Sequence, residues 1–213
     1  MWTTGRRIRD GVPVGLSGWT VCTATVADAE AIGALHVRSW RHAYRGIVPD
    51  AVLAALDPAE RADRWRETLR SPGSHRVFVA VGDGSAGPRL GAFCAVGPVR
   101  DARRDGWAGA RTGELYALYA DPDAFGRGAG PAAHRAGVDR LRAAGHRCAV
   151  LWVLTENARA RSFYARHGWH DDEMVEEHQH VGVGLSVVRY SRWLTLTPGV
   201  PGAVVASLAG GAR

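Results

Sequence analysis

Three glycines at alternate positions, Gly126, Gly128 and Gly130, separate an apolar, strand-like run from a segment with helical periodicity. Glycine lets the backbone of such a turn approach a ligand closely and direct its N–H groups toward that ligand. The helix that begins behind the turn adds the positive end of its dipole, so the pattern favours binding of a phosphate group. The turn lacks the Gly-Lys-Ser/Thr ending of a P-loop and does not fit the dinucleotide-binding pattern G-x-G-x-x-G. Many tight turns are rich in glycine, so the turn alone is weak evidence of a site.

A second candidate segment begins at Cys148–Leu154, a continuous apolar run of the kind that forms a buried parallel strand. Asn157 then stands where a helix N-cap is expected, and Gly168 stands where a left-handed C-cap residue would end the same helix. Between the two caps, one face of the predicted helix carries Ala160, Phe163, Tyr164 and His167. Together with the glycine turn, this strand and capped helix form a pattern that is more specific than either part.

The two segments together resemble the GNAT superfamily of acyl-CoA-dependent N-acyltransferases. That family combines a pyrophosphate-binding loop, Arg/Gln-x-x-Gly-x-Gly/Ala, with a later helix of pattern Asn-x-x-Ala-x-x-Phe-Tyr-x-x-x-Gly-Phe/Trp. Both patterns occur here in the same order and at matching spacing, and the resemblance extends over about residues 20–194. One position departs from the family, because Phe125 stands where the loop has Arg or Gln. Backbone N–H groups would make most of the phosphate contacts. The loss of one side chain therefore affects the expected affinity for the cofactor more than the assignment to the family.

The resemblance implies an α/β (α+β) fold, the GNAT fold, with a central mixed, mostly antiparallel sheet and helices on both faces. Two parallel strands, Glu114–Ala120 and Cys148–Leu154, are expected to splay apart, with acyl-CoA in the gap between them. Backbone groups of the first strand would then pair with the pantetheine arm and offer an N–H to the thioester oxygen. The alternative for L-Y-A-L-Y is an ordinary buried strand, and Asn157 is alternatively only a helix cap. The residues implied in cofactor binding are Leu118, Tyr119, Ala120, Phe125, Gly126, Arg127, Gly128, Ala129, Gly130, Asn157 and Phe163.

The resemblance also implies two catalytic side chains, Tyr164 and Glu114. An amine that attacks a thioester must be neutral, and the thiolate that leaves needs a proton. Tyr164 occupies the family's general-acid position, and a phenol with an ordinary pKa of about 10 can protonate a thiolate. Glu114 opens the strand beside the acyl group, where many relatives carry a carboxylate that takes the amine proton through water. The structural alternatives are aromatic packing for Tyr164 and an exposed charge at a strand start for Glu114.

The sequence does not identify the amine acceptor, and we expect a primary amine of a small molecule or a peptide. Relatives form the acceptor pocket from the first two helices and the last hairpin, which here contain S-W-R-H-A-Y-R-G-I-V-P and M-V-E-E-H-Q-H. Trp40 and Tyr44, at i,i+4 spacing, form either an aromatic wall of this pocket or a staple between helix and core. Glu173, Glu176 and Glu177 favour a cationic acceptor if they face the cleft.

Two histidines of the last hairpin, His178 and His180, would share one face of a strand and could bind a transition metal weakly. Nothing at a fixed spacing supplies a third and a fourth ligand, and acetyl transfer needs no metal. We therefore expect a solvated, charged hairpin and no metal site, with acetyl-CoA or another acyl-CoA as the cosubstrate.

The elements that must position these residues follow from periodicity, caps and turn signals. We expect strands at Trp19–Ala24, Val77–Val81, Leu90–Val96 and Gly113–Ala120. Helices are expected from Thr25 to Arg45 and at Pro49–Leu56, Pro58–Leu69 and Pro131–Ala144. A charged loop is expected at Asp101–Thr112 and a hairpin at Trp169–Leu194. The acetyltransferase domain is placed at residues 19–194, between an N-terminal extension at 1–18 and a flexible C-terminal tail at 195–213.

Composition excludes several classes of protein. The chain has 46% hydrophobic and 23% charged residues, as soluble globular proteins do. Its net charge is +6, but its arginines alternate with acidic residues as on solvated helix faces, so we expect no nucleic-acid partner. The absence of lysine suggests GC-rich bacterial coding, and three distant cysteines argue against a disulfide framework. Without a signal-peptide pattern or a long apolar run, we expect a cytoplasmic protein that does not contact a membrane.

Three functions remain open at this point. The first is an active N-acetyltransferase that uses acetyl-CoA and a primary amine. The second is a catalytically inactive GNAT-fold module that binds acyl-CoA as a sensor or structural partner, and the third is an arginine-rich nucleic-acid-binding protein. The presence of both Glu114 and Tyr164 favours the first function. Association into a homodimer is left open.

Overall fold

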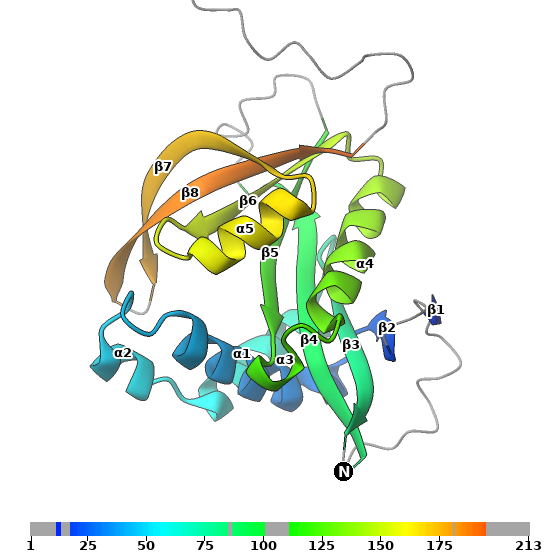
Figure 1. The fold of residues 1–213 in the computed structure, drawn as a ribbon. Helices are drawn as coiled ribbons and strands as arrows, with labels where there is room; N and C mark the ends of the chain where they lie inside the picture. The colour runs from blue at the N-terminus through cyan, green and yellow to red at the C-terminus, as the bar shows by residue number, and fades with distance from the viewer. Residues whose placement is uncertain (1–11, 14–17, 85–86, 101–110, 181, 195–213) are drawn as a thin grey trace, which may run out of the picture.

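The computed structural model describes residues 12–13, 18–84, 87–100, 111–180 and 182–194 (Figure 1). Its strands are β1 (Val12–Pro13), β2 (Trp19–Thr23), β3 (Arg76–Gly84), β4 (Gly87–Pro98), β5 (Thr112–Ala120), β6 (Cys148–Leu154), β7 (His170–His180) and β8 (Val183–Trp193). They form one sheet in the order β1-β2-β3-β4-β5-β6-β8-β7. All neighbouring strands are antiparallel except β5 and β6, which run parallel. The predicted mixed, mostly antiparallel sheet is confirmed.

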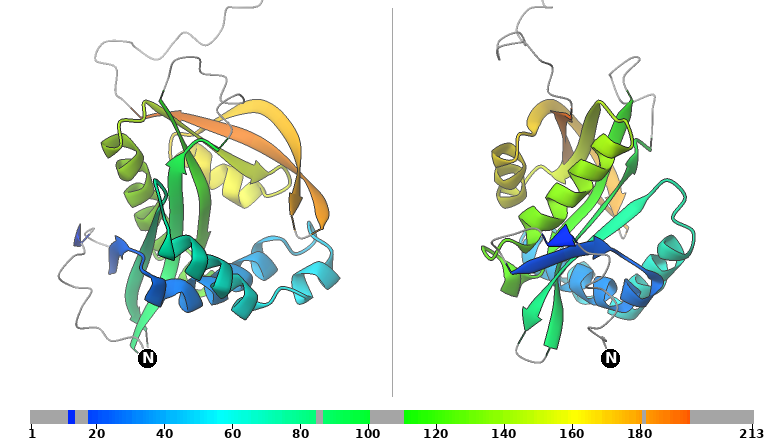
Figure 2. Two further views of the ribbon diagram at one scale, coloured as in Figure 1. Left: turned by 180° about the vertical axis from the view of Figure 1, so that it is seen from behind. Right: turned by 90° about the vertical axis from the view of Figure 1, so that its right-hand side faces the viewer.

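Helices cover both faces of this sheet, as predicted (Figure 2). They are α1 (Ala29–Ala43), α2 (Asp50–Ala54), α3 (Pro58–Arg70), α4 (Ala129–Ala143) and α5 (Ala158–Arg166), with short 3-10 turns at Val26–Asp28 and Pro122–Ala124. The helices form one layer on each face of the sheet, because alternate side chains of strand β4 pack into two different cores. Cys94 and Val96 pack with α4, while Phe93 and Ala95 pack with α1 and α3.

The parallel strands β5 and β6 separate soon after they meet. They pair only at Thr112–Glu114 with Cys148–Val150, although β5 continues to Ala120 and β6 to Leu154. On its other side β5 stays paired with β4, with a register shift at Tyr116 between the pairs Val96–Leu115 and Ala95–Ala117. Such a bulge increases the local twist and bends the strand, which helps β5 to diverge from β6. The predicted splay is confirmed.

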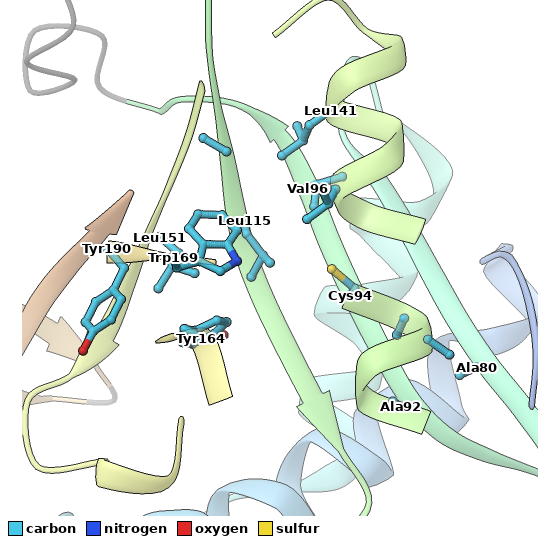
Figure 3. Close-up of a cluster of buried hydrophobic side chains, with 14 of the residues drawn as sticks. Ala80, Ala92, Cys94, Val96, Leu115, Leu141, Leu151, Tyr164, Trp169 and Tyr190 are labelled. Carbon is cyan, nitrogen blue, oxygen red and sulfur yellow. The ribbon is translucent and has the colours of Figure 1, made fainter. Parts of the chain in front are cut away.

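The core beside this splay is formed by aromatic and aliphatic side chains from α5 and the strands that flank it (Figure 3). Trp169 is 2% exposed, and its indole Nε1 donates to Nε2 of His134 on α4 at 2.9 Å. Burial, together with the charges of His167 and Arg192, lowers the pKa of His134 to about 3. The neutral imidazole can therefore accept this hydrogen bond, which ties the end of α5 to α4.

Several element boundaries differ from the sequence-based prediction. Strands β3 and β4 extend beyond Val77–Val81 and Leu90–Val96, since cross-strand pairing continues to Gly84 and Gly87 despite the turn-forming residues there. Val12–Pro13, inside the predicted extension, pairs with Thr20 and Val21 of β2. Helix α4 begins at Ala129 instead of Pro131, and the helix predicted from Thr25 opens with a 3-10 turn. Residues 101–110 of the predicted loop, and the tail at 195–213, lie outside the described residues.

Gly33 sets the separation of α1 from α3. A Cβ added there would lie 2.6 Å from the backbone N of Ala62 and 2.8 Å from the carbonyl oxygen of Pro58. We predict that Gly33→Ala lowers the free energy of unfolding by about 1–3 kcal/mol, because backbone atoms of two helices would have to move apart. Urea denaturation measures the change. Gly130→Ala is the matched control, since its Cβ would meet only Ala120 Cβ at 3.7 Å and should cost no stability. Equal stability of the two variants would contradict the close packing of α1 on α3.

Candidate active site

A pocket of about 1070 Å³ opens where β5 and β6 separate. Helices α1, α4 and α5 and strands β5 to β8 all contribute to its wall. Two predicted residues do not line it: the Arg127 carbonyl accepts from the indole Nε1 of Trp19 at 2.6 Å, and Ala129 is fully buried. The predicted residues that the fold brings together around the pocket are Trp40, Tyr44, Glu114, Leu118, Tyr119, Ala120, Phe125, Gly126, Gly128, Gly130, Asn157, Phe163 and Tyr164.

The glycine turn lies at the N-terminus of α4. Gly126 and Gly128 have φ values of +73° and +89°, which are left-handed conformations that favour glycine. Gly128 is the N-cap of α4, so the free N–H groups of the first helical turn lie beside the pocket. This arrangement can bind an anion through backbone N–H groups and the helix dipole.

Polar contacts from α1 hold the end of β5 beside the turn. The Ser39 hydroxyl donates to the carbonyl oxygen of Ala120 at 2.9 Å, and Arg38 pairs with the buried carboxylate of Asp121. Asp121 also accepts from the N–H of Asp123 at 3.0 Å, which caps the 3-10 turn leading to the glycines. The Ala120 carbonyl, predicted to face the pantetheine, therefore already has a partner. Sequence reasoning missed Arg38 and Ser39, although a serine on the buried face of a helix is a signal of such a contact.

Arg159 of α5 supplies a positive charge at the turn. Its guanidinium carbon lies 3.6 Å from the centroid of the Phe125 ring, a cation–π contact, and both residues line the pocket. Phe125 occupies the loop position at which the GNAT pattern has Arg or Gln. The neighbouring helix thus brings a cation to the position where the loop lacks one, and the sequence alone did not indicate this pairing.

Tyr164 is buried at the base of the pocket. Its ring packs beside Trp169 and Tyr190, with centroid distances of 6.1 and 6.4 Å (Figure 3). Among the residues that the structure describes, its hydroxyl has no hydrogen-bond partner, and the residue lines the pocket. Burial, with smaller contributions from Cys94 and Tyr119, raises the pKa of this phenol. The group therefore stays protonated, as a proton donor to a bound ligand must.

Glu114 is buried and paired with Arg100. The residue is 3% exposed, and its Oε2 accepts the backbone N–H of Arg100 at 2.9 Å while Oε1 accepts from the guanidinium Nε, also at 2.9 Å. The Arg100 side chain is 61% exposed and lies over the ring of Tyr116, 4.9 Å from its centroid. The alternative of an exposed charge at a strand start is therefore excluded, because the carboxylate is buried and paired with Arg100. The arginine partner was not predicted from the sequence.

Trp40 and Tyr44 belong both to the pocket and to a core. Their rings meet edge to face at 4.8 Å, and they pack with Leu154, Leu185 and other residues in one buried cluster. The Tyr44 and Tyr119 hydroxyls lie 3.3 Å apart, and burial raises the pKa of both phenols. Trp40 and Tyr44 can therefore form an aromatic wall of the pocket and also staple the helix to the core, so these two alternatives are compatible.

Side-chain hydrogen bonds fix the N-terminal half of helix α5. The Asn157 side chain accepts from the N–H of Ala160 at 3.1 Å, so it is the predicted cap, and it also lines the pocket. Arg161 donates to the Thr155 carbonyl at 3.0 Å and to the Tyr190 hydroxyl at 3.2 Å. These contacts hold α5 against the final hairpin and so position Tyr164.

The hairpin β7–β8 closes the opposite end of the pocket. Glu176, Glu177 and His178 line the pocket, whereas Glu173 lies outside it on a β-bulge with φ of 58°. In the part of the chain that the structure describes, no group of three or more His, Cys, Asp or Glu residues could hold a metal ion. The described helices include none with the length and apolar character needed to cross a membrane.

Comparisons with known proteins agree with this architecture. The model of the acetyltransferase (GNAT) family matches residues 29–169. The uncharacterized N-acetyltransferase YuaI of Bacillus subtilis is 33% identical over 138 residues, which are 65% of this chain and 73% of that protein. Mycothiol acetyltransferase of Beutenbergia cavernae is 48% identical over 60 residues, which are 28% of this chain but only 20% of that protein.

Solved structures show the same fold at low sequence identity. PaiA N-acetyltransferase from Thermoplasma acidophilum, in complex with coenzyme A, has a TM-score of 0.59 at 16% identity, covering 81% of this chain and 97% of that chain. YncA, a putative acetyltransferase from Salmonella typhimurium with acetyl-CoA, has a TM-score of 0.58 at 18% identity, covering 87% and 99%.

The glycine turn generates a binding prediction. We expect acetyl-CoA to raise the melting temperature of the wild-type protein, as a ligand specific for the folded state does. Gly128→Val should abolish this rise, because a branched side chain at the helix N-cap blocks close approach of a phosphate to the backbone. Thermal unfolding with and without acetyl-CoA measures both quantities.

Gly46→Val is the matched control for strain. Gly46 also has a positive φ of +78°, a Cβ added there would have no heavy atom within 4 Å, and the residue lies outside the pocket lining. This variant should lose stability in the absence of ligand as Gly128→Val does, but keep the rise caused by acetyl-CoA. An undiminished rise in Gly128→Val would contradict phosphate binding at the turn.

Proposed function

Because the chain belongs to the GNAT acetyltransferase family and is an acyltransferase, we propose that it transfers an acetyl group from acetyl-CoA to a primary amine. The acceptor is a small molecule or a peptide, and its amine attacks the thioester directly while both substrates are bound. The observation that most supports this proposal is a single pocket that joins the glycine turn, the separated strands and Tyr164. A phosphate, an extended arm and a reacting thioester fit those three parts in that order.

Cofactor binding would use backbone groups more than side chains. The N–H groups of Gly126, Gly128 and Gly130 and the dipole of α4 suit the pyrophosphate, and Arg159 adds a charge-assisted contact. Beyond Glu114, β5 has no pairing with β6, so the pantetheine arm can run along this edge. The backbone groups of Leu118 and Tyr119 would then pair with the arm as they would with a neighbouring strand. Asn157 and Phe163 would lie on the other side of the arm.

The proposed reaction needs one proton acceptor and one proton donor. The neutral amine attacks the carbonyl carbon, and a backbone N–H of β5 stabilises the oxyanion that forms. Glu114 accepts the proton that the amine nitrogen loses, directly or through water. The carbon–sulfur bond then breaks, and Tyr164 donates its proton to the departing thiolate. Burial disfavours the thiolate as well as the phenolate, so it raises the pKa of the thiol and of the phenol together. Proton transfer from Tyr164 to the thiolate therefore does not require that the phenol keep its ordinary pKa.

Arg100 has a defined part in this proposal. In the structure its guanidinium neutralises the buried Glu114 carboxylate. Because its side chain is largely exposed, it can withdraw toward solvent when an amine enters and free the carboxylate to accept a proton. Proton transfer to Glu114 would then be coupled to acceptor binding.

Amine-dependent release of free thiol tests the proposed function directly. Purified protein is incubated with acetyl-CoA and each member of a panel of primary amines, thiol is measured with a chromogenic disulfide, and the N-acetyl product is identified by mass spectrometry. Release that depends on an amine supports the enzyme. Stabilisation by acetyl-CoA without any amine-dependent release would instead support the inactive acyl-CoA-binding module.

Tyr164→Phe isolates proton donation from packing, because it removes the hydroxyl and keeps the ring. We predict a fall in kcat of about 100-fold or more, the usual contribution of general acid catalysis, with unchanged stabilisation by acetyl-CoA. Tyr190→Phe is the comparison variant: Tyr190 lies outside the pocket lining, and its hydroxyl accepts from Arg161, so this variant measures the loss that comes from the position of α5 alone. Pre-steady-state thiol release measures the chemical step itself. A chemical step of normal rate in Tyr164→Phe would remove the catalytic role and leave Tyr164 as part of the cofactor wall.

Glu114→Gln and Arg100→Gln both break the same ion pair, but only the first removes the carboxylate. We predict that Glu114→Gln lowers kcat/KM by about 100-fold or more and flattens the acidic limb of its pH profile, as loss of a general base does. Arg100→Gln should keep a pH-dependent acidic limb and lose much less activity. Steady-state rates across a pH series compare the two variants. Equal losses would show that the ion pair, and not the carboxylate as a base, is what the reaction needs.

A further inference from the structure

The two ends of the pocket carry opposite charges. At one end, α5 contributes Arg159, Arg166 and His167, next to the N-terminus of α4. On the side of the hairpin, β7 contributes Glu176 and Glu177 to the wall, and β8 contributes Arg189. The basic end suits the phosphates of the cofactor, so the acidic end is left for the acceptor.

Strand register decides which of the two carboxylates faces the acceptor. Glu176 is paired with Val187, which is paired in turn with Leu154 of β6, and directly paired residues place their side chains on one face of a sheet. Val187 and Leu154 are buried in the cluster that contains Trp40 and Tyr44, so Glu176 lies on the pocket side. Its side chain is 23% exposed.

Glu177 lies on the other face of the hairpin. A Cβ added to Gly184 of β8 would be 2.0 Å from Oε1 of Glu177, so this side chain lies across Gly184. Glu177 is paired with Ser186, which is adjacent to Val187 in β8 and therefore faces the opposite side of the sheet. Both residues contribute atoms to the pocket wall, but only Glu176 has its carboxylate on the pocket face of the hairpin, whereas the Glu177 carboxylate lies across Gly184 on the other face.

Neighbouring side chains hold Glu176 and shape the space beside it. Nε2 of His178 lies 3.1 Å from Oε2 of Glu176, and the His178 ring lies 5.0 Å from that of Trp152 on β6. The arginine of β8 at this end, Arg189, is paired with Asp172 at 2.7 Å and its side chain is only 8% exposed. Its charge is thus balanced by Asp172 within the hairpin, and Glu176 is the carboxylate that β7 places on the pocket face.

In the proposed function Glu114 already accepts the proton of the amine that reacts, so a second carboxylate is not needed at that nitrogen. Glu176 is suited instead to a second positive group of the acceptor, separated from the reacting amine by a spacer. The intervening wall, formed by Trp40, Tyr44 and Trp152, is aromatic and fits an apolar spacer.

We propose that the acceptor is a dicationic amine, in which an apolar spacer separates the amine that is acetylated from a second cationic group bound by Glu176. This proposal rests on the proposed function and deepens it by naming the chemical class of the acceptor. It assigns Glu176 as a specificity-determining residue that contacts the distal end of the substrate and takes no part in proton transfer.

Matched amines that differ only in the distal group test the proposal. We would measure kcat/KM for pentylamine, cadaverine and δ-aminovalerate, and for butylamine, putrescine and γ-aminobutyrate, so that neutral, cationic and anionic ends are compared at two spacer lengths. In the wild-type protein the diamine should exceed its neutral partner by about tenfold or more, as one charge-assisted contact implies. The amino acids should be the poorest substrates, and added salt should reduce the preference for diamines.

Glu176→Gln should reduce the ratio of the kcat/KM values for diamine and monoamine to about one, through a higher KM for the diamine. Glu177→Gln is the matched control and should keep the wild-type ratio. Melting temperatures of both variants establish that they are folded, and the salt dependence of the wild-type ratio stands as evidence if Glu176→Gln does not fold. Equal turnover of all three amines, or a preference that survives Glu176→Gln, would overturn the dicationic acceptor and leave the proposed function intact. Stabilisation by acetyl-CoA with no thiol release from any amine would overturn the proposed function, and this inference with it.

Discussion

The short pairing between β5 and β6 is the constraint on which the rest of the structure depends. Three positions of each strand meet, from Thr112 to Glu114 and from Cys148 to Val150, before the strands separate. Buried backbone groups need hydrogen-bond partners, so a gap inside a sheet is stable only where side chains, water or a ligand can supply them. Ser39 satisfies the Ala120 carbonyl at the far end of β5. The gap is therefore a supported opening in the core, and the candidate functional residues that line the pocket are arranged around it.

Elements on both sides keep this gap open by different means. On the side of β5, α1 holds the strand end through Ser39 and the ion pair of Arg38 with Asp121. On the side of β6, Arg161 attaches α5 to the hairpin, and the bond from Trp169 to His134 attaches it to α4. Since α5 carries Tyr164 and Arg159, the contacts that maintain the opening also set the positions of the proposed acid and of the cation beside the glycine turn.

The sequence predicts local features of this site well and long-range ones poorly. The left-handed glycines, the Asn157 cap and the place of Tyr164 on its helix follow from short-range preferences and from the family pattern, and the structure has the turn, the cap and the pocket position. Arg100, Arg159 and the orientation of Glu176 could not be predicted, because each depends on how segments distant in sequence pack or pair. The bulge at Tyr116 is likewise a property of the paired strands.

The two ends of the pocket come from different parts of the chain, and this division has a consequence for how such a protein can diversify. The turn, α4 and α5 lie between residues 126 and 166, whereas the hairpin follows them at residues 170–193. The outward and inward faces of β7 alternate residue by residue, so a single exchange on its pocket face alters one wall of the acceptor end. Such an exchange touches no residue of the glycine turn. If the chain has the proposed function, selection can therefore change which amine is accepted while the residues proposed to bind the thioester are inherited intact.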